Sequence, residues 1–177
     1  MLQKKLMKLA QEQDANALTQ IIEEHYDMIY RYCYKKVGDS FIAQDITQDT
    51  FLRFVSNINT YSNCGKLKGY LYTIARNLCN DWYRQKKPVL LDEKTEILDF
   101  SAINSLNKVI DNISLKQMIS KLPSAQQEVI ILRYGEDLKL REIADITGTT
   151  IFAIQYRLKA ALSKLKKLEK EGYSLEK

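Results

Sequence analysis

The residues best suited to chemistry combine aromatic rings with cations on one predicted helical face, between residues 66 and 87. Helical spacing brings together Tyr72, Arg76, Asn80, Tyr83 and Lys87. Such a face suits single-stranded nucleic acid, because bases stack on aromatic rings and phosphates pair with cations. In the loop before it, Tyr61 and Asn63 could hold an unstacked base by its edges. A solvated amphipathic face is an equally good interpretation of the same residues.

A second candidate site follows a tight turn nearer the C-terminus. Ala144 is small enough for two helices to cross closely, and Gly148 can adopt the left-handed conformation of a tight turn. Ile154 returns to the core six residues later. This spacing predicts a helix-turn-helix over residues 140–165, whose second helix is free to enter a major groove of DNA.

The outward face of that second helix carries side chains that could reach base edges, and its cations could hold phosphates. The predicted contacts with duplex DNA are Arg133, Thr150, Phe152, Gln155, Tyr156, Arg157 and Lys159, followed by Lys164, Lys166 and Lys167. An ordinary helical hairpin would show similar apolar stripes. This outward face and the basic balance of the segment favour DNA binding over that alternative.

A third polar cluster lies on a predicted helix over residues 40–57. Asp45, Gln48 and Asp49 stand close to Phe51, and two acids near an exposed aromatic could bind a basic partner surface. They could equally be solvated charge. The sequence has no Ser/His/Asp order, no Gly-rich phosphate loop and no clustered carboxylates beside a base, so we expect neither catalysis nor a cofactor.

The cysteines set the only metal or redox alternative. Cys33, Cys64 and Cys79 are far apart, without a Cys-x-x-Cys pair, and the lone His25 lies on an apolar helical face. A zinc or redox sensor would require the fold to bring the cysteines to His25, and the spacing gives this no support. We therefore expect no metal site and reduced thiols, as is typical of the cytoplasm.

Charge is unevenly distributed along the 177 residues, whose net charge is +5. Residues 1–87 carry 13 basic and 9 acidic side chains, residues 88–112 carry 2 and 5, and residues 113–177 carry 12 and 8. Two basic segments around an acidic one suit a protein that contacts a polyanion with both ends. No run approaches the roughly 18 apolar residues of a membrane span, so we expect a cytoplasmic protein without membrane insertion.

The elements that position these residues are predicted to be helices, because Gly and Pro are scarce, at 6 and 2. We predict an all-α protein of two small domains, residues 1–87 and 109–177, joined by a flexible acidic linker over residues 88–108. Asp14 should cap a helix running to Lys36, and Gly38 should end it. Leu2, Leu6 and Leu9 form a short apolar stripe, and a buried stripe is expected at Leu67, Leu71, Ile74, Leu78 and Trp82. Asp137 is expected to cap the first helix of the helix-turn-helix.

Four stretches in order carry a family resemblance. They are residues 43–51 (AQDITQDTF), residues 69–77 (GYLYTIARN) with Asp81 and Arg84, Leu122-Pro123, and residues 142–144 (EIA) with Arg157-Leu158. With them, the whole chain resembles the extracytoplasmic-function (ECF) group of bacterial RNA polymerase sigma factors, in the sigma-70 family. The resemblance implies an alternative sigma factor that binds core RNA polymerase, directs it to specific promoters and melts the −10 region.

The resemblance also assigns roles to the three clusters. Asp45, Gln48, Asp49 and Phe51 would contact the clamp helices of the largest polymerase subunit. Loop 57–66 and the following helix would melt the −10 element and hold a flipped base, while the helix-turn-helix reads the −35 element and its domain rests on the polymerase flap. The chain would thus meet promoter DNA in both double- and single-stranded form. Similar proteins are often held inactive by a membrane-linked anti-sigma factor, which makes such a factor a candidate partner.

Residues 153–158 (AIQYRL) depart from the family, which usually has Thr-Val-Lys-Ser-Arg-Leu there. The departure implies an unusual −35 preference or weak −35 binding. The main rival interpretation is a conventional helix-turn-helix regulator that does not bind polymerase and whose N-terminal domain senses a ligand or dimerises. The cluster near Asp45 and the aromatic-basic helix favour the sigma factor, since a regulator needs neither.

Overall fold

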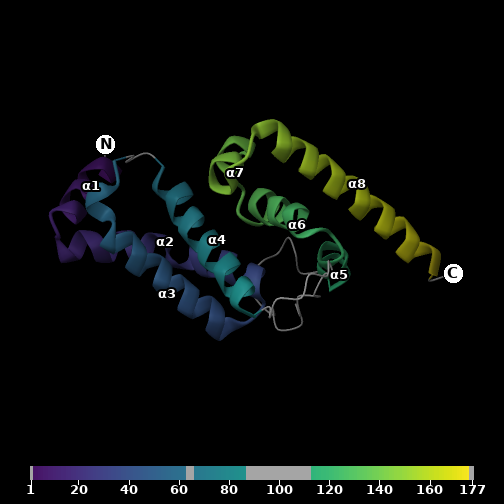
Figure 1. Cartoon of the computed structure of the whole chain (residues 1–177), viewed down its shortest axis with the longest axis horizontal. Coiled ribbons are helices and arrows are strands. Elements are labelled where there is room, and N and C mark those ends of the chain that lie inside the picture. Colours follow the sequence, from purple (N-terminus) through teal and green to yellow (C-terminus); the bar gives the residue numbers. More distant parts are fainter. Residues whose placement is uncertain (1, 63–65, 87–112, 176–177) are drawn as a thin grey trace. The chain divides into compact units, whose positions relative to one another are not determined.

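The computed structural model describes residues 2–62, 66–86 and 113–175, and all the regular elements in these ranges are helices, as predicted. The chain divides into two compact units, Met1–Val89 and Leu90–Lys177. The predicted acidic linker, residues 88–108, lies outside the described residues. The first unit contains α1 (Leu2–Gln11), α2 (Ala15–Val37), α3 (Ser40–Ser56), a short 3-10 helix η1 (Ile58–Thr60) and α4 (Leu67–Lys86). Figure 1 labels the four α-helices.

Local capping explains the bounds of α2 and α3. The carboxylate of Asp14 accepts the N–H of Ala17 at 2.8 Å, and α2 ends at Gly38, whose φ of 74° is left-handed. Asp39 then accepts the N–H groups of Phe41 and Ile42 at 2.9 and 3.0 Å and starts α3. These caps confirm the predicted boundaries, because each depends only on residues within one turn.

The core of the first unit lies between α2, α3 and α4. Tyr32 and Tyr72 are fully buried there and meet edge to face, with ring centroids 5.3 Å apart. The predicted core stripe of α4 is only partly right. Leu67, Leu71 and Leu78 are buried, but Ile74 and Trp82 are half-buried, and the face is completed instead by Tyr72, Ala75 and Cys79.

The first helix also differs from its prediction. Met7 and Ala10 are the buried residues of α1, whereas Leu9 is exposed and Leu6 half-buried. Leu9 of the apolar stripe therefore lies off the buried face of α1, because the helix turns the side of Met7 and Ala10 toward the rest of the unit.

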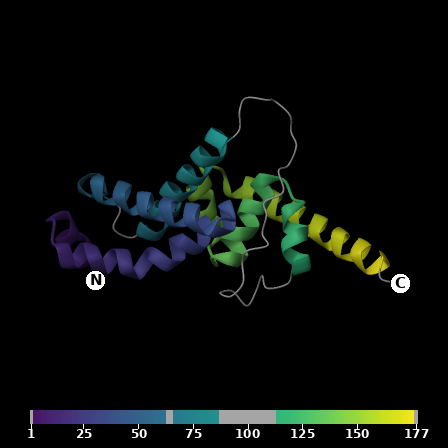
Figure 2. The same ribbon diagram turned by 90° about the horizontal axis from the view of Figure 1, so that it is seen from below.

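The second unit contains α5 (Ile113–Ser120), α6 (Ser124–Ile130), a π-helical turn η2 (Ile131–Gly135), α7 (Leu140–Thr147) and α8 (Ile151–Leu175). Its core joins α5, α6 and α8 through Ile119, Leu122, Ile130 and Ala161, flanked by Leu115, Leu158 and Leu165. Two views show α8 as one unbroken helix whose C-terminal half projects beyond the other helices of the unit (Figures 1 and 2).

The helix-turn-helix is formed by α7 and α8. Gly148 ends α7 with a left-handed φ of 65°, and the N–H of Thr149 donates to the carbonyl of Ala144 at 3.0 Å. Asp137 does not cap α7, contrary to the prediction. The carboxylate of Glu142 accepts the backbone N–H of Lys139 at 2.7 Å, while Asp137 takes a positive φ of 51° in the preceding turn.

Gly148→Ala is expected to destabilise the second unit by about 1 kcal/mol, because a side chain strains a left-handed backbone. A Cβ at Gly148 would meet no atom within 4 Å, so strain and not crowding would cause the loss. Gly69→Ala is the control: Gly69 has equal space but lies in α4 without a positive φ, so alanine should be neutral or stabilising. Urea unfolding of both variants would test this, and a Gly148→Ala protein as stable as the parent would contradict it.

Candidate nucleic-acid interface

The exposed face of α3 combines apolar and acidic side chains. Phe41, Asp45, Gln48 and Leu52 follow one another at intervals of three or four residues, which places them on one side of the helix. Phe41 is 77% exposed and Leu52 is 65% exposed. Asp45 and Gln48 are exposed between them. We call these four residues the α3 stripe, and Asp49 is exposed beside it.

Phe51 does not belong to this surface. It is buried, and its ring stacks on Tyr26 of α2 with centroids 6.0 Å apart, so the predicted exposed aromatic near the two acids was wrong. Burial, together with the neighbouring Tyr30, raises the pKa of Tyr26, so this phenol stays neutral at physiological pH. Sequence reasoning missed Phe41 and Leu52, although their spacing from Asp45 and Gln48 was the available signal.

The predicted aromatic-cation face of α4 has fewer exposed aromatic rings than expected. Tyr72 is in the core, and Tyr61 is buried with its ring stacked on Tyr70 at 4.9 Å. Tyr83 is half-buried and donates its hydroxyl to the backbone carbonyl of Lys36. These three rings therefore support the fold, and the prediction that Tyr72 lies opposite the core was wrong.

The remaining polar residues of α4 do reach the surface. Asn80 is exposed and Arg76 is half-buried. Trp82, expected in the core, is half-buried and lies under the Lys86 ammonium, which is 4.5 Å from the ring centroid. An aromatic-cation pair therefore exists near the end of α4, on a residue that sequence reasoning had assigned to the core. Asn63 and Lys87 lie outside the described residues.

The loop before α4 is fastened to α1. The side-chain amide of Gln11 donates to the carbonyl of Ile58 at 3.1 Å and to that of Tyr61 at 2.8 Å. Ile58 is buried, and its carbonyl also accepts the N–H of Tyr61 at 3.2 Å. The described part of the loop, residues 57–62, is thus held on both sides, by α1 and by the ring of Tyr70.

The first turns of α8 present two large aromatic rings to solvent. Phe152 is 82% exposed and Tyr156 is 77% exposed, and Gln155 and Lys159 are exposed on the same side. Thr150 is exposed as well, and its hydroxyl accepts the N–H of Ala153 at 3.2 Å. A helix end with exposed aromatic, amide and cationic groups can meet base edges in a major groove.

Two of the predicted contacts on the second unit are less accessible. Arg133 is half-buried and its guanidinium donates to the carbonyl of Leu138 at 2.9 Å, which holds the turn before α7. Arg157 is also half-buried. Part of the donor capacity of Arg133 is therefore used within the fold.

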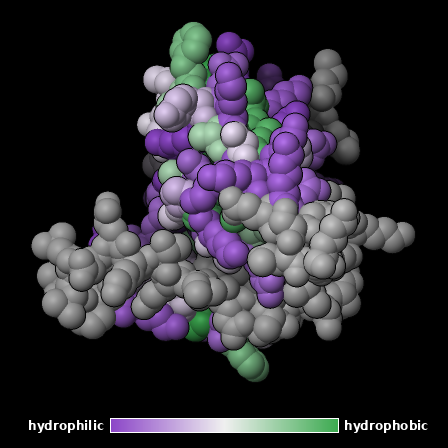
Figure 3. All heavy atoms as spheres, turned by 90° about the vertical axis from the view of Figure 1, so that its right-hand side faces the viewer, coloured by the Kyte–Doolittle hydropathy of each residue, from purple (hydrophilic) through white to green (hydrophobic). Residues whose placement is uncertain are grey.

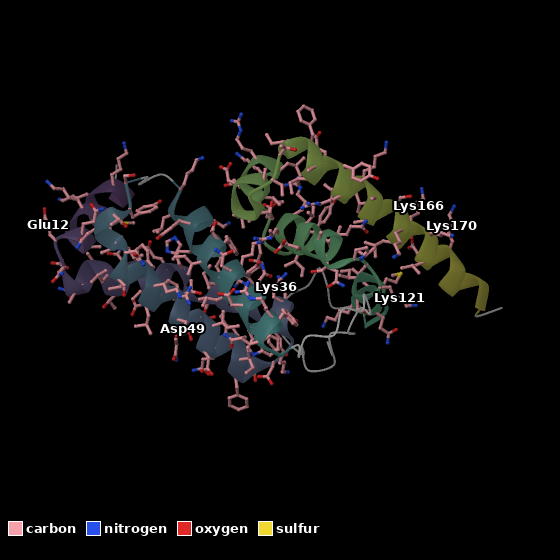
Figure 4. All side chains as sticks on the ribbon, viewed as in Figure 1. Glu12, Lys36, Asp49, Lys121, Lys166 and Lys170 are labelled. Atoms are coloured by element: carbon pink, nitrogen blue, oxygen red, sulfur yellow. The ribbon has the colours of Figure 1, made fainter. Side chains whose placement is uncertain are left out.

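Lysines continue the exposed face of α8. Lys166 and Lys170 project from the same side of the helix (Figure 4), and Lys164 and Lys167 are exposed too. Figure 3, which looks toward the end of α8, shows hydrophilic residues over much of the described surface. The face therefore changes along its length from aromatic groups, suited to bases, to cations, suited to phosphates.

Other kinds of site find little support in the part of the chain that the structure describes. Within those ranges no group of three or more His, Cys, Asp or Glu side chains could hold a metal ion. Cys33 and Cys79 are both buried in the first unit. Among the same residues, no helix has the length and apolar character needed to cross a membrane.

Comparison with known proteins identifies the family. The family model described as sigma-70 region 2 matches residues 21–89, and that described as sigma-70, region 4 matches residues 113–165. The ECF RNA polymerase sigma factor SigW of Bacillus subtilis is 30% identical over 182 residues, covering 94% of this chain and 96% of SigW. This chain belongs to the ECF group of the sigma-70 family. The ECF sigma factor BldN of Streptomyces coelicolor is 32% identical, and this sigma factor spans 64% of the length of BldN.

Solved structures agree on the fold. CnrH, in complex with the cytosolic domain of CnrY, matches with a TM-score of 0.72 and 19% identity, over 94% of this chain and 96% of CnrH. The sigma factor RpoE from Bartonella quintana, in complex with the anti-sigma factor NepR, gives 0.68 and 22%, over 86% and 96%. Because sigma factors are not enzymes, membership confirms the prediction that this chain is not one. It also disfavours the conventional regulator.

Proposed function

We propose that this sigma factor binds core RNA polymerase, directs it to specific promoters and melts their −10 region. The α3 stripe would contact polymerase, α4 with the 57–62 loop would contact the −10 element, and the first turns of α8 would contact the −35 element. The observation that carries the proposal is the α3 stripe, since Phe41 and Leu52 lie uncovered beside acids within the region 2 match. Two large apolar side chains on one exposed helix face, with acids between them, could serve as the few anchoring residues of a protein interface.

In the polymerase contact, Phe41 and Leu52 would be the anchors. A few side chains buried at the centre of an interface supply most of its affinity, and the surrounding charges set orientation and association rate. Asp45, Gln48 and Asp49 would be those surrounding polar groups, facing basic residues of the clamp helices in the largest subunit. Phe51 would support the contact indirectly, because its buried ring packs α3 against Tyr26 of α2.

In the −10 contact, the exposed and half-buried polar groups of α4 would meet the separated strand. Asn80 can bond a base edge, Arg76 a phosphate, and the Trp82–Lys86 pair offers a ring beside a cation. Tyr61, Tyr72 and Tyr83 would take a supporting role, because their rings or hydroxyls are engaged within the unit. Asn63 and Lys87 stay predictions on sequence grounds alone.

In the −35 contact, the exposed groups of α8 suggest which bases are preferred. An amide such as Gln155 pairs with adenine in the major groove, and an apolar side chain such as Phe152 contacts the methyl group of thymine. We therefore propose a −35 element that contains A·T pairs opposite these residues, with Tyr156 and Lys159 beside them. Arg157, Arg133 and the lysines would hold phosphates, while the domain rests on the polymerase flap.

An anti-sigma factor is a candidate partner, supported by the anti-sigma factor NepR in the RpoE complex, which shares this fold. Such a factor would act by covering one of the exposed faces that polymerase or DNA requires. Because the proposed partner is bacterial RNA polymerase, we propose that this sigma factor acts in the cytoplasm.

The test is transcription with purified components. Core polymerase stripped of sigma factors, mixed with this chain and a library of genomic fragments, should give run-off transcripts from a small set of discrete start sites. Core polymerase alone is the control and should give none of these products. Failure to form a complex with core polymerase, together with no specific transcript from any fragment, would overturn the proposal.

A further inference from the structure

The region 2 match begins at residue 21, so α1 lies outside the part of the chain that the family model covers. Yet α1 makes the two hydrogen bonds that fasten the loop before α4, through the side chain of Gln11. Donor and acceptors are separated by 47 and 50 residues in the sequence. This contact is therefore tertiary, and it joins α1 to the loop instead of closing the loop on itself.

The chemistry of the contact is specific to an amide. Both partners are backbone carbonyls, which only accept, and the amide nitrogen of Gln11 has two N–H groups to donate. A shorter side chain would not reach both carbonyls, and a carboxylate of the same size would present only acceptors to them. The contact is part-buried, so water replaces the lost bonds incompletely.

The helix that carries Gln11 is packed on one side and hydrogen-bonded at its C-terminal end. Met7 and Ala10 bury one side of α1 in the first unit. The helix then turns into α2 through Gln13, which has a positive φ of 63°, and the N–H of Asp14 donates to the carbonyl of Leu9 at 3.0 Å. Gln11 is thus presented from a helix that is fixed at both its face and its end.

We propose that Gln11 is a positioning residue for the −10 element, which fixes the backbone of residues 57–62 in the shape that receives a base. The inference rests on the proposed function, in which this loop lies against the melted strand. It adds that α1 takes part in promoter choice without touching DNA. Residues that hold a binding loop from behind control how selective the loop is, because an unfastened loop adapts to several bases.

The experiment compares Gln11→Glu and Gln11→Ala with Lys8→Ala in the holoenzyme. Lys8 is an exposed residue of α1 whose ion pair with Glu12, labelled in Figure 4, spans 4.0 Å. The readout is binding to single strands that carry the −10 element or each of its base substitutions. Both Gln11 variants should lose about tenfold in preference for the native −10 strand over its substituted forms, because a released loop no longer holds one base contact in place and such a contact contributes about 1–3 kcal/mol of discrimination. Lys8→Ala should match the parent, and affinity for core polymerase should be unchanged in all three.

Asn80→Ala distinguishes a failure of the proposed −10 function from a failure of the proposed role of Gln11. If the parent prefers the −10 strand and Asn80→Ala weakens that binding, the proposed function stands, and native selectivity in both Gln11 variants would overturn only the present inference. If the parent itself shows no preference for any strand, the proposed −10 role fails and the inference fails with it. Equal loss of binding to all strands would also overturn the inference, because it would indicate general damage to the unit.

Discussion

Replacing Asp45 by lysine is expected to weaken binding to core RNA polymerase by about a hundredfold, because a like charge set into a charged interface costs several kcal/mol. Asp45 is exposed on α3 between Phe41 and Leu52, so the same change should leave the free energy of unfolding nearly unaltered. The measurement is the dissociation constant for sigma-free core polymerase at fixed salt, alongside urea unfolding. Raising the salt concentration should reduce the difference between the two proteins.

Glu23→Lys is the matched control for this prediction. It makes the same change of charge at an exposed residue of the same unit, but on α2 instead of α3. If both variants lose affinity equally, net charge and not the stripe is responsible. Unchanged affinity of Asp45→Lys would remove Asp45 from the interface.

The second large effect is expected when the two aromatic rings of α8 are removed together. Phe152→Ala with Tyr156→Ala should lower affinity for −35 duplex DNA by about thirtyfold to a hundredfold relative to unrelated duplex, since each contact with a base edge contributes about 1–3 kcal/mol of discrimination. Both side chains are more than three-quarters exposed, so the fold should survive. Holoenzyme binding to promoter fragments with and without a −35 element provides the measurement.

Tyr134→Ala is the control for this pair. Tyr134 is a 48% exposed aromatic in the same unit, on η2 and not on α8, so its removal tests whether loss of any surface ring weakens binding. The double variant should also keep the salt dependence of nonspecific binding, because the lysines of α8 remain. A double variant that still distinguishes the −35 element from unrelated duplex would show that the reading residues lie elsewhere.

The helices and turns were predictable because their determinants are local. Asp14, Asp39 and Gly148 act within one turn of their own position, so the sequence reveals both their function and the boundary they set. The all-α class and the helix-turn-helix follow from the same kind of signal. The prediction for Asp137 was wrong because Glu142, the third residue of α7, supplies the carboxylate that accepts the N–H of Lys139.

The faces of the helices were harder to predict. On α4, the leucine spacing is compatible with a core completed by Ile74 and Trp82 or by Tyr72 and Cys79, and only packing against α2 and α3 decides between them. Tyrosine is ambiguous because its ring can be buried while its hydroxyl bonds a polar group. On α3, Phe51 was predicted to be exposed but is buried, and the exposed apolar residue is its neighbour Leu52. The two hydrogen bonds from Gln11 to the carbonyls of Ile58 and Tyr61 join residues far apart in the sequence, so no local pattern predicts them.

The exposure of Phe41 and Leu52 also bears on the lifetime of the protein in a cell. If polymerase covers the α3 stripe as we propose, Phe41 and Leu52 face water in the unbound chain, where exposed apolar side chains can be recognised by chaperones and proteases. In the proposed function, occupancy and abundance would be linked: a chain bound to polymerase would be protected, while surplus chains would be degraded most readily. The helix face that we assign to polymerase would in this way also limit how much unbound factor accumulates.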